Sequence, residues 1–249
     1  SALRPLLFGD GDGAGSANSN AVDGGSGVWT ATSTNWTDAN GTANGVMHPQ
    51  PGFAIFQSTA GTVTVDASAG PIGVTGMQFA TDGYQITGAP ITLADPNSII
   101  RVGDGTAAGI YYKATIGSVL TGTGGLNKTD LGTLILTADN TYTGGTTITD
   151  GTLQLGNGGT SGSVLGNIAN SGTLIFNRSD ASSYAGSISG SGIVDLIGPG
   201  TINLTGNSSG FNGTVLVESG TPGVKSGGVL GAGGVYAGIG AGTTGAIAV

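Results

Sequence analysis

The sequence repeats one short phrase, a glycine and a threonine followed by an apolar, a variable and an apolar residue. The phrase reads GTVTV at 61–65, GTLIL at 132–136, GTLQL at 151–155, GTLIF at 172–176, GTINL at 200–204 and GTVLV at 213–217. Alternating apolar residues are typical of a half-buried strand, and the segments between the copies are rich in turn-forming Gly, Asn and Asp. Each copy is therefore predicted to be one short strand, opened by a turn.

The spacing of the copies predicts stacked repeats. Three copies begin 19 and then 21 residues apart, and residues 132–152 align with 200–221 at an offset of 68 to 69 residues. That longer offset suits three coils of about 23 residues, and it places Tyr142 opposite Phe211 and Ile148 opposite Leu216. Strands this short cannot bury a face alone, but stacked coils pair each strand with its copies about 4.8 Å away.

We therefore predict an all-β chain that forms a parallel β-solenoid. Inward Leu, Ile and Val would form continuous columns, while Thr, Ser and Asn would face water. A β-sandwich is the alternative, since it is also built from regular short strands with turns between them.

Charge and composition exclude several kinds of partner. Six lysine and arginine residues stand against 14 aspartate and glutamate, a formal net charge of −8 at pH 7. Because so few cations cannot neutralise a run of phosphates, we predict no nucleic-acid partner and no anionic membrane partner. No apolar run approaches the roughly 20 residues of a membrane helix, so no membrane insertion is predicted. The chain has no cysteine, and we expect any signal peptide to have been removed already.

The chain divides into three predicted parts. They are a flexible, Gly-rich N-terminal arm (1–27), an N-terminal capping region with the first irregular coils (28–120), and regular coils (121–249). The open end of a solenoid must be covered, because its unpaired edge invites aggregation. Trp29 and Trp36 are the predicted cap residues. The C-terminal stretch 231–249 reads as a coil that has been cut through.

One segment carries a family resemblance. Residues 124–157, GGLNKTDLGTLILTADNTYTGGTTITDGTLQLGN, resemble the passenger-associated repeat of bacterial autotransporters, the surface proteins of type V secretion. Residues 27–41, 61–67 and 76–88 look like the region that often precedes the first such repeat. The resemblance implies a passenger domain folded as a right-handed parallel β-helix. It also implies display on the surface of a Gram-negative bacterium, after export through the outer membrane by a C-terminal β-barrel translocator outside these residues. In this family the repeat is associated with secretion and folding, so it need not be where a ligand binds.

No catalytic residue is predicted, and we expect the chain not to be an enzyme. Some autotransporter passengers are lipases with a Gly-Asp-Ser-Leu motif, and Gly9 and Asp10 match its start. Gly11 stands where the nucleophilic serine belongs, and His48 is the one histidine, so acyl transfer lacks its nucleophile.

A β-helix glycan-active enzyme is the least favoured alternative. Such enzymes need clustered carboxylates. The acids here are mostly single turn residues: Asp82, Asp95, Asp104, Asp139 and Asp150. Arg101 with Asp104, and Lys128 with Asp130, are predicted to form local ion pairs.

Neither a metal nor a cofactor is predicted. Asp10 and Asp12 alternate as calcium ligands do, but an EF-hand loop starting at Asp10 would place Ala14 and Ala21 at ligand positions. We predict a solvated loop there, and a weak calcium site is the alternative.

No partner-binding residue is assigned from the sequence. Tyr111 and Tyr112 are adjacent in a predicted strand, so one ring must face outward. An exposed tyrosine is a common contact residue, and a tyrosine lying over a coil edge is the alternative.

The predicted function is adhesion. The partner would be a host extracellular-matrix protein, a cell-surface glycan, or a second copy on a neighbouring cell, as in aggregation or biofilm formation. The alternative is a structural stalk that supports secretion and folding and has no ligand of its own. The irregular segment 28–120 favours an adhesin, because a plain spacer would need only regular coils.

Overall fold

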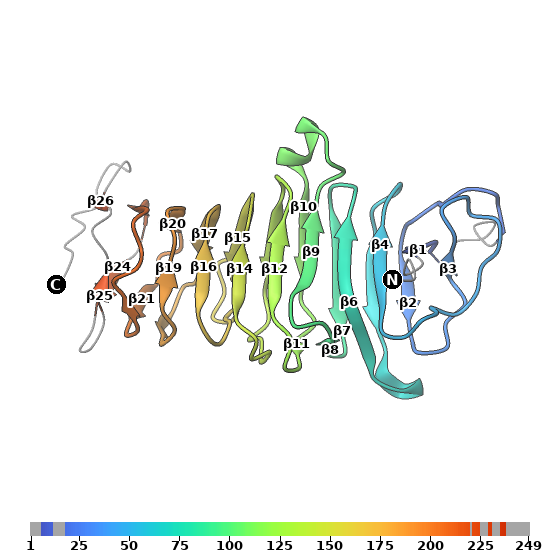
Figure 1. Ribbon diagram of the computed structural model, residues 1–249, viewed down its shortest axis with the longest axis horizontal. Coiled ribbons are helices and arrows are strands. Elements are labelled where there is room, and N and C mark those ends of the chain that lie inside the picture. Colours follow the sequence, from blue (N-terminus) through green and yellow to red (C-terminus); the bar gives the residue numbers. More distant parts are fainter. Residues whose placement is uncertain (1–5, 12–17, 220, 225–228, 231–234, 238–249) are drawn as a thin grey trace.

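The computed structural model of the chain describes residues 6–11, 18–219, 221–224, 229–230 and 235–237, with side chains for 9–11 and 18–219. Asp12 and most of the C-terminal stretch 231–249 lie outside the described residues. Figure 1 shows the strands as a row of coils, with β1 to β3 at one end and the later coils at the other.

The described elements are short strands with two 3₁₀ turns. In chain order they are β1 (Leu6–Gly9), β2 (Gly27–Trp29), β3 (Trp36–Thr37), β4 (Gly52–Phe56), β5 (Thr62–Val65), η1 (Ala67–Ala69), β6 (Ile72–Phe79), β7 (Tyr84–Gly88), β8 (Ile91–Leu93), β9 (Ser98–Val102), η2 (Ala107–Tyr111), β10 (Lys113–Ile116), β11 (Leu120–Thr121), β12 (Leu126–Thr129), β13 (Thr133–Leu136), β14 (Thr146–Ile148), β15 (Thr152–Leu155), β16 (Ile168–Asn170), β17 (Thr173–Phe176), β18 (Ala181–Tyr184), β19 (Ile188–Ser189), β20 (Ile193–Leu196), β21 (Thr201–Leu204), β22 (Asn207–Ser208), β23 (Thr214–Val217), β24 (Thr221–Val224), β25 (Val229–Leu230) and β26 (Val235–Ala237).

Two long sheets run the length of the stack. The ten-strand sheet has the order β2-β5-β7-β10-β13-β15-β17-β20-β23-β26. The eleven-strand sheet runs from β19 through β16, β14, β12, β9, β6, β4 and β1 to β3, and its other two strands lie off this path, with β8 paired to β6 and β11 paired to β8. Neighbouring strands are parallel except β1 with β3. Later coils add a three-strand sheet, β18-β21-β24. The predicted parallel β-solenoid is confirmed, while its right-handed sense stays a prediction.

The coils are shorter than the sequence suggested. Thr133, Thr152 and Thr173 lie level in the ten-strand sheet, and Ile193 and Thr214 continue the same row. Successive coils therefore take 19 to 21 residues here, and the prediction of about 23 is wrong.

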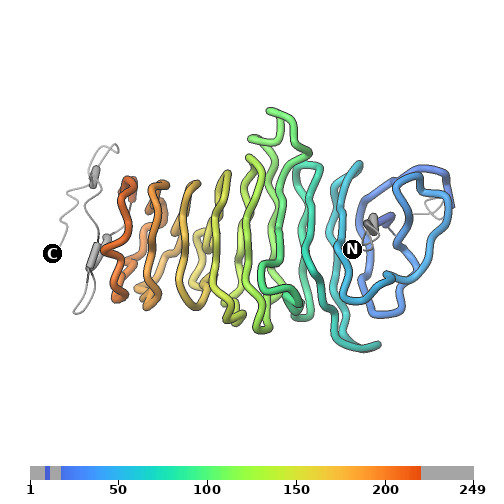
Figure 2. The backbone as a smooth tube through the Cα atoms, in the orientation of Figure 1, coloured from blue at the N-terminus to red at the C-terminus, as the bar shows by residue number. Residues whose placement is uncertain are grey.

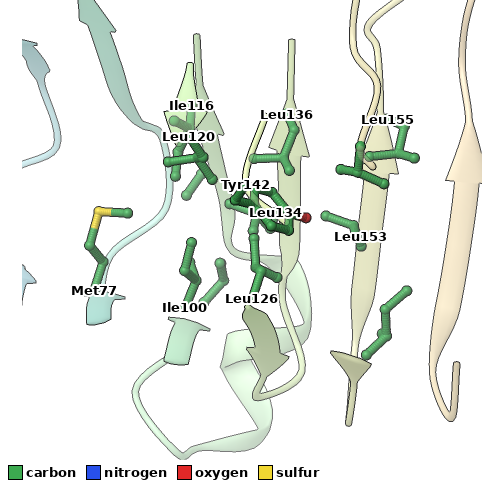
Figure 3. Close-up of a cluster of buried hydrophobic side chains, with 14 of the residues drawn as sticks. Met77, Ile100, Ile116, Leu120, Leu126, Leu134, Leu136, Tyr142, Leu153 and Leu155 are labelled. Atoms are coloured by element: carbon green, nitrogen blue, oxygen red, sulfur yellow. The ribbon is translucent and has the colours of Figure 1, made fainter. Parts of the chain in front are cut away.

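The core is a set of parallel columns inside the stack. Leu134, Leu153 and Leu174 form one column in register and are buried. Figure 3 shows Leu134 and Leu153 on successive strands, with Tyr142 among the interior side chains. Burying each leucine stabilises the fold by about 1.5–3 kcal/mol, but only when the next coil covers it.

An aromatic cluster fills the N-terminal end of the stack. Trp29 and Trp36 are buried with ring centroids 5.0 Å apart, and both meet Phe56 edge-on at 6.0 and 5.8 Å. This placement fits the predicted cap. Strand β1, inside the predicted arm, pairs with β4 and β3, so these residues belong to the sheet. The division of the chain at residues 27 and 120 stays a prediction.

A column of glycines explains why the repeated phrase begins as it does. Its members are Gly132, Gly151, Gly172, Gly192 and Gly213. A Cβ atom on Gly172 would meet the carbonyl oxygen of Gly151, and one on Gly192 would meet that of Gly172. The same carbonyls accept the N–H of the following residue one coil on, at 2.9 Å for Thr173 and 2.8 Å for Ile193. The glycine thus lets the coils approach closely enough to hydrogen-bond.

Candidate functional site

One turn of the solenoid is much longer than its equivalents. Between β12 and β13 the chain turns in three residues (130–132), but between β9 and β10 it takes ten (103–112), which include η2. We name residues 103–112 the lobe. Figures 1 and 2 show it projecting from the edge of the stack.

The tip of the lobe is apolar and exposed. Tyr111 is 78% exposed and Ile110 57%, the two highest values among the exposed large hydrophobic side chains of the described residues. Tyr112 is partly buried, and its hydroxyl donates to the Asp104 carboxylate at 3.2 Å. The prediction that one tyrosine of the pair faces outward is confirmed. The predicted strand is wrong there, because Tyr111 lies in a 3₁₀ turn.

Asp130 anchors the lobe to the coil that follows it. Its carboxylate accepts from Arg101 Nε at 2.8 Å, from the Gly105 N–H at 3.0 Å and from the Leu131 N–H at 2.8 Å. The predicted ion pair of Arg101 with Asp104 is therefore wrong. Burial alone would raise the pKa of the Asp130 carboxyl, but the hydrogen bonds, chiefly that from Arg101, hold it below the ordinary value. The lobe is thus held in one arrangement.

We expect Asp130→Asn to loosen the lobe without unfolding the solenoid. Asparagine keeps the shape and tolerates the left-handed backbone at this position (φ 65°), but it loses the charge that holds Arg101. Chymotrypsin should then cleave at Tyr111 or Tyr112 several-fold faster, while the thermal midpoint changes by only a few degrees. Because the pKa of Asp130 is lowered in the fold, the wild-type lobe should hold above pH 4 and loosen as the pH falls below it. Unchanged cleavage of the variant would show that the carboxylate does not anchor the lobe.

A second group of polar residues points into the solenoid. The buried ammonium of Lys128 donates to the backbone carbonyls of Thr129 (2.9 Å), Asp130 (2.7 Å) and Asp150 (3.1 Å). It therefore joins two successive turns, and the predicted side-chain ion pair of Lys128 with Asp130 is wrong. Burial lowers the pKa of Lys128 to about 8. No pattern in the sequence predicts that this lysine is buried.

Asn140 makes a similar link on another edge of the stack. Its side chain accepts the Leu120 N–H at 2.9 Å and donates to the Ser163 carbonyl at 3.0 Å, one coil to either side. Tyr142 is buried as well, with its hydroxyl 2.6 Å from that of Thr146. Lys128 and Asn140 thus join successive coils, while the Tyr142 hydroxyl bonds within its own coil.

The N-terminal residues considered as a site have structural roles. Asp10 is buried, and its carboxylate accepts from the Asp23 N–H at 2.7 Å and from Asn44 Nδ2 at 2.8 Å, so the predicted solvated loop is wrong at this residue. A Cβ atom on Gly11 would meet the carbonyl oxygen of Gly24, which leaves no room for a serine side chain. Within the described residues, no three His, Cys, Asp or Glu side chains are grouped so that they could hold a metal ion.

The five acids predicted to be turn residues (Asp82, Asp95, Asp104, Asp139 and Asp150) lie between the strands. Asp82 accepts the Lys113 N–H at 2.7 Å, and Asp150 accepts the Gly151 N–H at 2.7 Å. Asp139 accepts from the hydroxyl of Ser163 at 2.8 Å. His48 is exposed. No helix in the described part of the chain has the length and apolar character to span a membrane.

Comparison with known proteins supports the resemblance. The family model of the passenger-associated-transport-repeat matches residues 126–155, which run from β12 to β15 and include Lys128, Asn140 and Tyr142. The adhesin BmaC autotransporter of Brucella suis biovar 1 (strain 1330) is 38% identical over 275 aligned residues. The alignment covers 74% of this chain and 8% of that protein. No solved structure matches the chain. The chain is therefore an autotransporter passenger β-solenoid that carries a passenger-associated transport repeat.

Proposed function

We propose that this passenger is an adhesin that acts at the bacterial surface or after secretion, exported with the help of its translocator. The observation that carries the proposal is the lobe. Insertions in a stacked repeat form loops on one face, and that face is often the binding face. Here the ten-residue lobe, seven residues longer than the turn on the next coil, presents Ile110 and Tyr111 on a turn that Asp130 already fixes, so little ordering entropy is lost on binding.

The partner we propose is a host extracellular-matrix protein, a cell-surface glycan or a second copy of the chain. Tyrosine is enriched among the residues that dominate binding energy, and an exposed aliphatic neighbour such as Ile110 helps to exclude water around it. The name of the Brucella relative supports adhesion rather than catalysis. We propose that the chain is not an enzyme.

A structural stalk is the second candidate, and one observation favours it. Two polar side chains of the repeat, Lys128 and Asn140, are directed inward and join successive coils. A stalk needs this cohesion and nothing more. It does not need the lobe, which is why adhesion is preferred.

The test is binding of the purified chain to immobilised fibronectin, collagen, laminin, host glycans and the chain itself. We expect saturable binding to one target, weakened about 10- to 30-fold when Ile110 and Tyr111 are both replaced with serine. Leu165→Ser is the matched control, because Leu165 is 49% exposed outside the lobe. It should bind like the wild type.

Two results would count against the proposal. If the Ile110 and Tyr111 variant binds with wild-type affinity, the lobe is not the surface that contacts the partner. If the folded wild-type chain binds none of the targets, the structural stalk becomes the favoured function.

A further inference from the structure

The outer face of the ten-strand sheet is not as polar as the sequence predicts. One outward row holds Ile135, Gln154, Ile175, Asp195 and Leu216 in register. Three of these five are aliphatic, where threonine, serine and asparagine were expected. The prediction that the outward positions are filled by Thr, Ser and Asn does not describe this row.

Asp195 lies within a ring of aliphatic side chains. Ile175 and Leu216 are its register partners on the neighbouring strands β17 and β23, about 4.8 Å away. Ile193 and Ile197 stand two residues before and after it and so share its face of the sheet. Ile193 is 37% exposed, and the other three are partly exposed. We call these five residues the Asp195 face.

The carboxylate of Asp195 is poorly satisfied in this setting. Its Oδ1 is enclosed and has no hydrogen-bond partner. Burial, and then the nearby carboxylate of Glu218, raise the pKa of Asp195. The backbone N–H of Leu196 acts in the opposite direction, but it does not offset these two effects. Because the carboxylate is partly exposed and only partly satisfied, a cationic donor brought by a partner would be favourable.

The described part of this chain offers little positive charge of its own for that role. Arg101 pairs with Asp130, and Arg178 pairs with Asp180 and Asp139. Lys128 is buried. With a net charge of −8, a second copy is a poor occupant, and charge complementarity favours a basic partner.

We propose that the Asp195 face binds an extended polypeptide segment of a partner protein that carries a lysine or arginine between aliphatic side chains. The cation would donate to the Asp195 carboxylate. The flanking aliphatic side chains would cover Ile175 and Leu216 and keep water from the ion pair, an arrangement typical of strong contact points. This surface is separate from the lobe, and the inference goes beyond the proposed adhesion through it.

The test uses the full chain and a labelled, capped seven-residue peptide of alternating threonine and valine with one central lysine. Fluorescence anisotropy should show saturable binding of this peptide. A central glutamine should weaken binding at least about tenfold, and a central glutamate should abolish it. Asp195→Asn should weaken binding of the lysine peptide by a similar factor. Asp150→Asn, which removes an exposed turn acid, should stay within about twofold of the wild type.

Several outcomes would overturn the proposal. They are no binding of the lysine peptide to the wild type, equal binding to Asp195→Asn, or equal binding of the glutamine peptide. Calcium binding that depends on Asp195, without peptide binding, would assign the face to a metal ion instead. Leu216→Ser is a second variant, which should weaken binding of the lysine peptide although the Asp195 carboxylate is still present. The Ile110 and Tyr111 double variant should still bind the peptide, which separates this test from that of the lobe.

Discussion

Replacing Gly172 with valine is expected to lower the free energy of unfolding by at least about 3 kcal/mol. The new Cβ would press on the carbonyl oxygen of Gly151, the atom that accepts the Thr173 N–H at 2.9 Å. Moving the coils apart to make room would weaken that bond and its neighbours. Backbone entropy alone predicts the opposite sign, because glycine loses more conformational freedom on folding than any other residue. Urea unfolding followed by circular dichroism measures the difference.

Gly159→Val is the matched control for this prediction. Nothing lies within 4 Å of a Cβ atom built on Gly159, which is exposed in a turn. Its variant should unfold within about 0.5 kcal/mol of the wild type. Equal losses from the two variants would show that close coil contact is not what the glycine column provides.

The strands and their inward faces could be predicted from the repeated phrase. The copies at 132–136, 151–155 and 172–176 fall in one sheet, level with one another, with their first leucines in the core. Because side chains alternate between the two faces of a strand, the apolar pattern predicts which ones face inward, even where the turns cannot be predicted.

The length of a coil was harder to predict than the strands. The copy at 200–204 has the same pattern, but it forms β21 in the three-strand sheet, so the pattern identifies a strand and not the sheet it joins. The long alignment therefore pairs the wrong residues. Phe211 bridges to Gly190, whose row contains Ile148, and it is not level with Tyr142.

The anchor of the lobe was also beyond sequence reasoning. In a solenoid the nearest side chain often belongs to the next coil, so the partner of Arg101 is Asp130, 29 residues away, and not Asp104. The bond of Asp10 with Asn44 is also long-range, 34 residues apart, but it lies where β1 and β3 pair antiparallel and not between stacked coils. Charge pairs read from adjacent positions miss such contacts, because stacking brings together residues one coil apart in sequence.

The burial of Lys128 predicts an unusual dependence of stability on pH. Its pKa falls from an ordinary 10.5 to about 8 in the fold, so between these values the unfolded chain binds a proton that the folded chain does not. Stability must then rise with pH across this window, by up to about 3 kcal/mol, and be lost again as the pH falls through 8. Urea unfolding at intervals from pH 7 to pH 9.5 should show the rise, below the range in which tyrosines of the unfolded chain ionise.

Lys128→Met should remove that rise, because methionine fills similar space and carries no proton. At pH 7 this variant loses three hydrogen bonds, but it also avoids the cost of a buried charge. Its net change in stability should therefore be smaller than that of Lys128→Ala, which also creates a cavity and should lower the free energy of unfolding by about 3 kcal/mol. Lys113→Met is the control, since Lys113 is exposed on β10, and its profile should run parallel to that of the wild type. A profile for Lys128→Met that also runs parallel to the wild type would mean that the lysine keeps its ordinary pKa, because its hydrogen bonds to the three carbonyls then offset the cost of burying its charge.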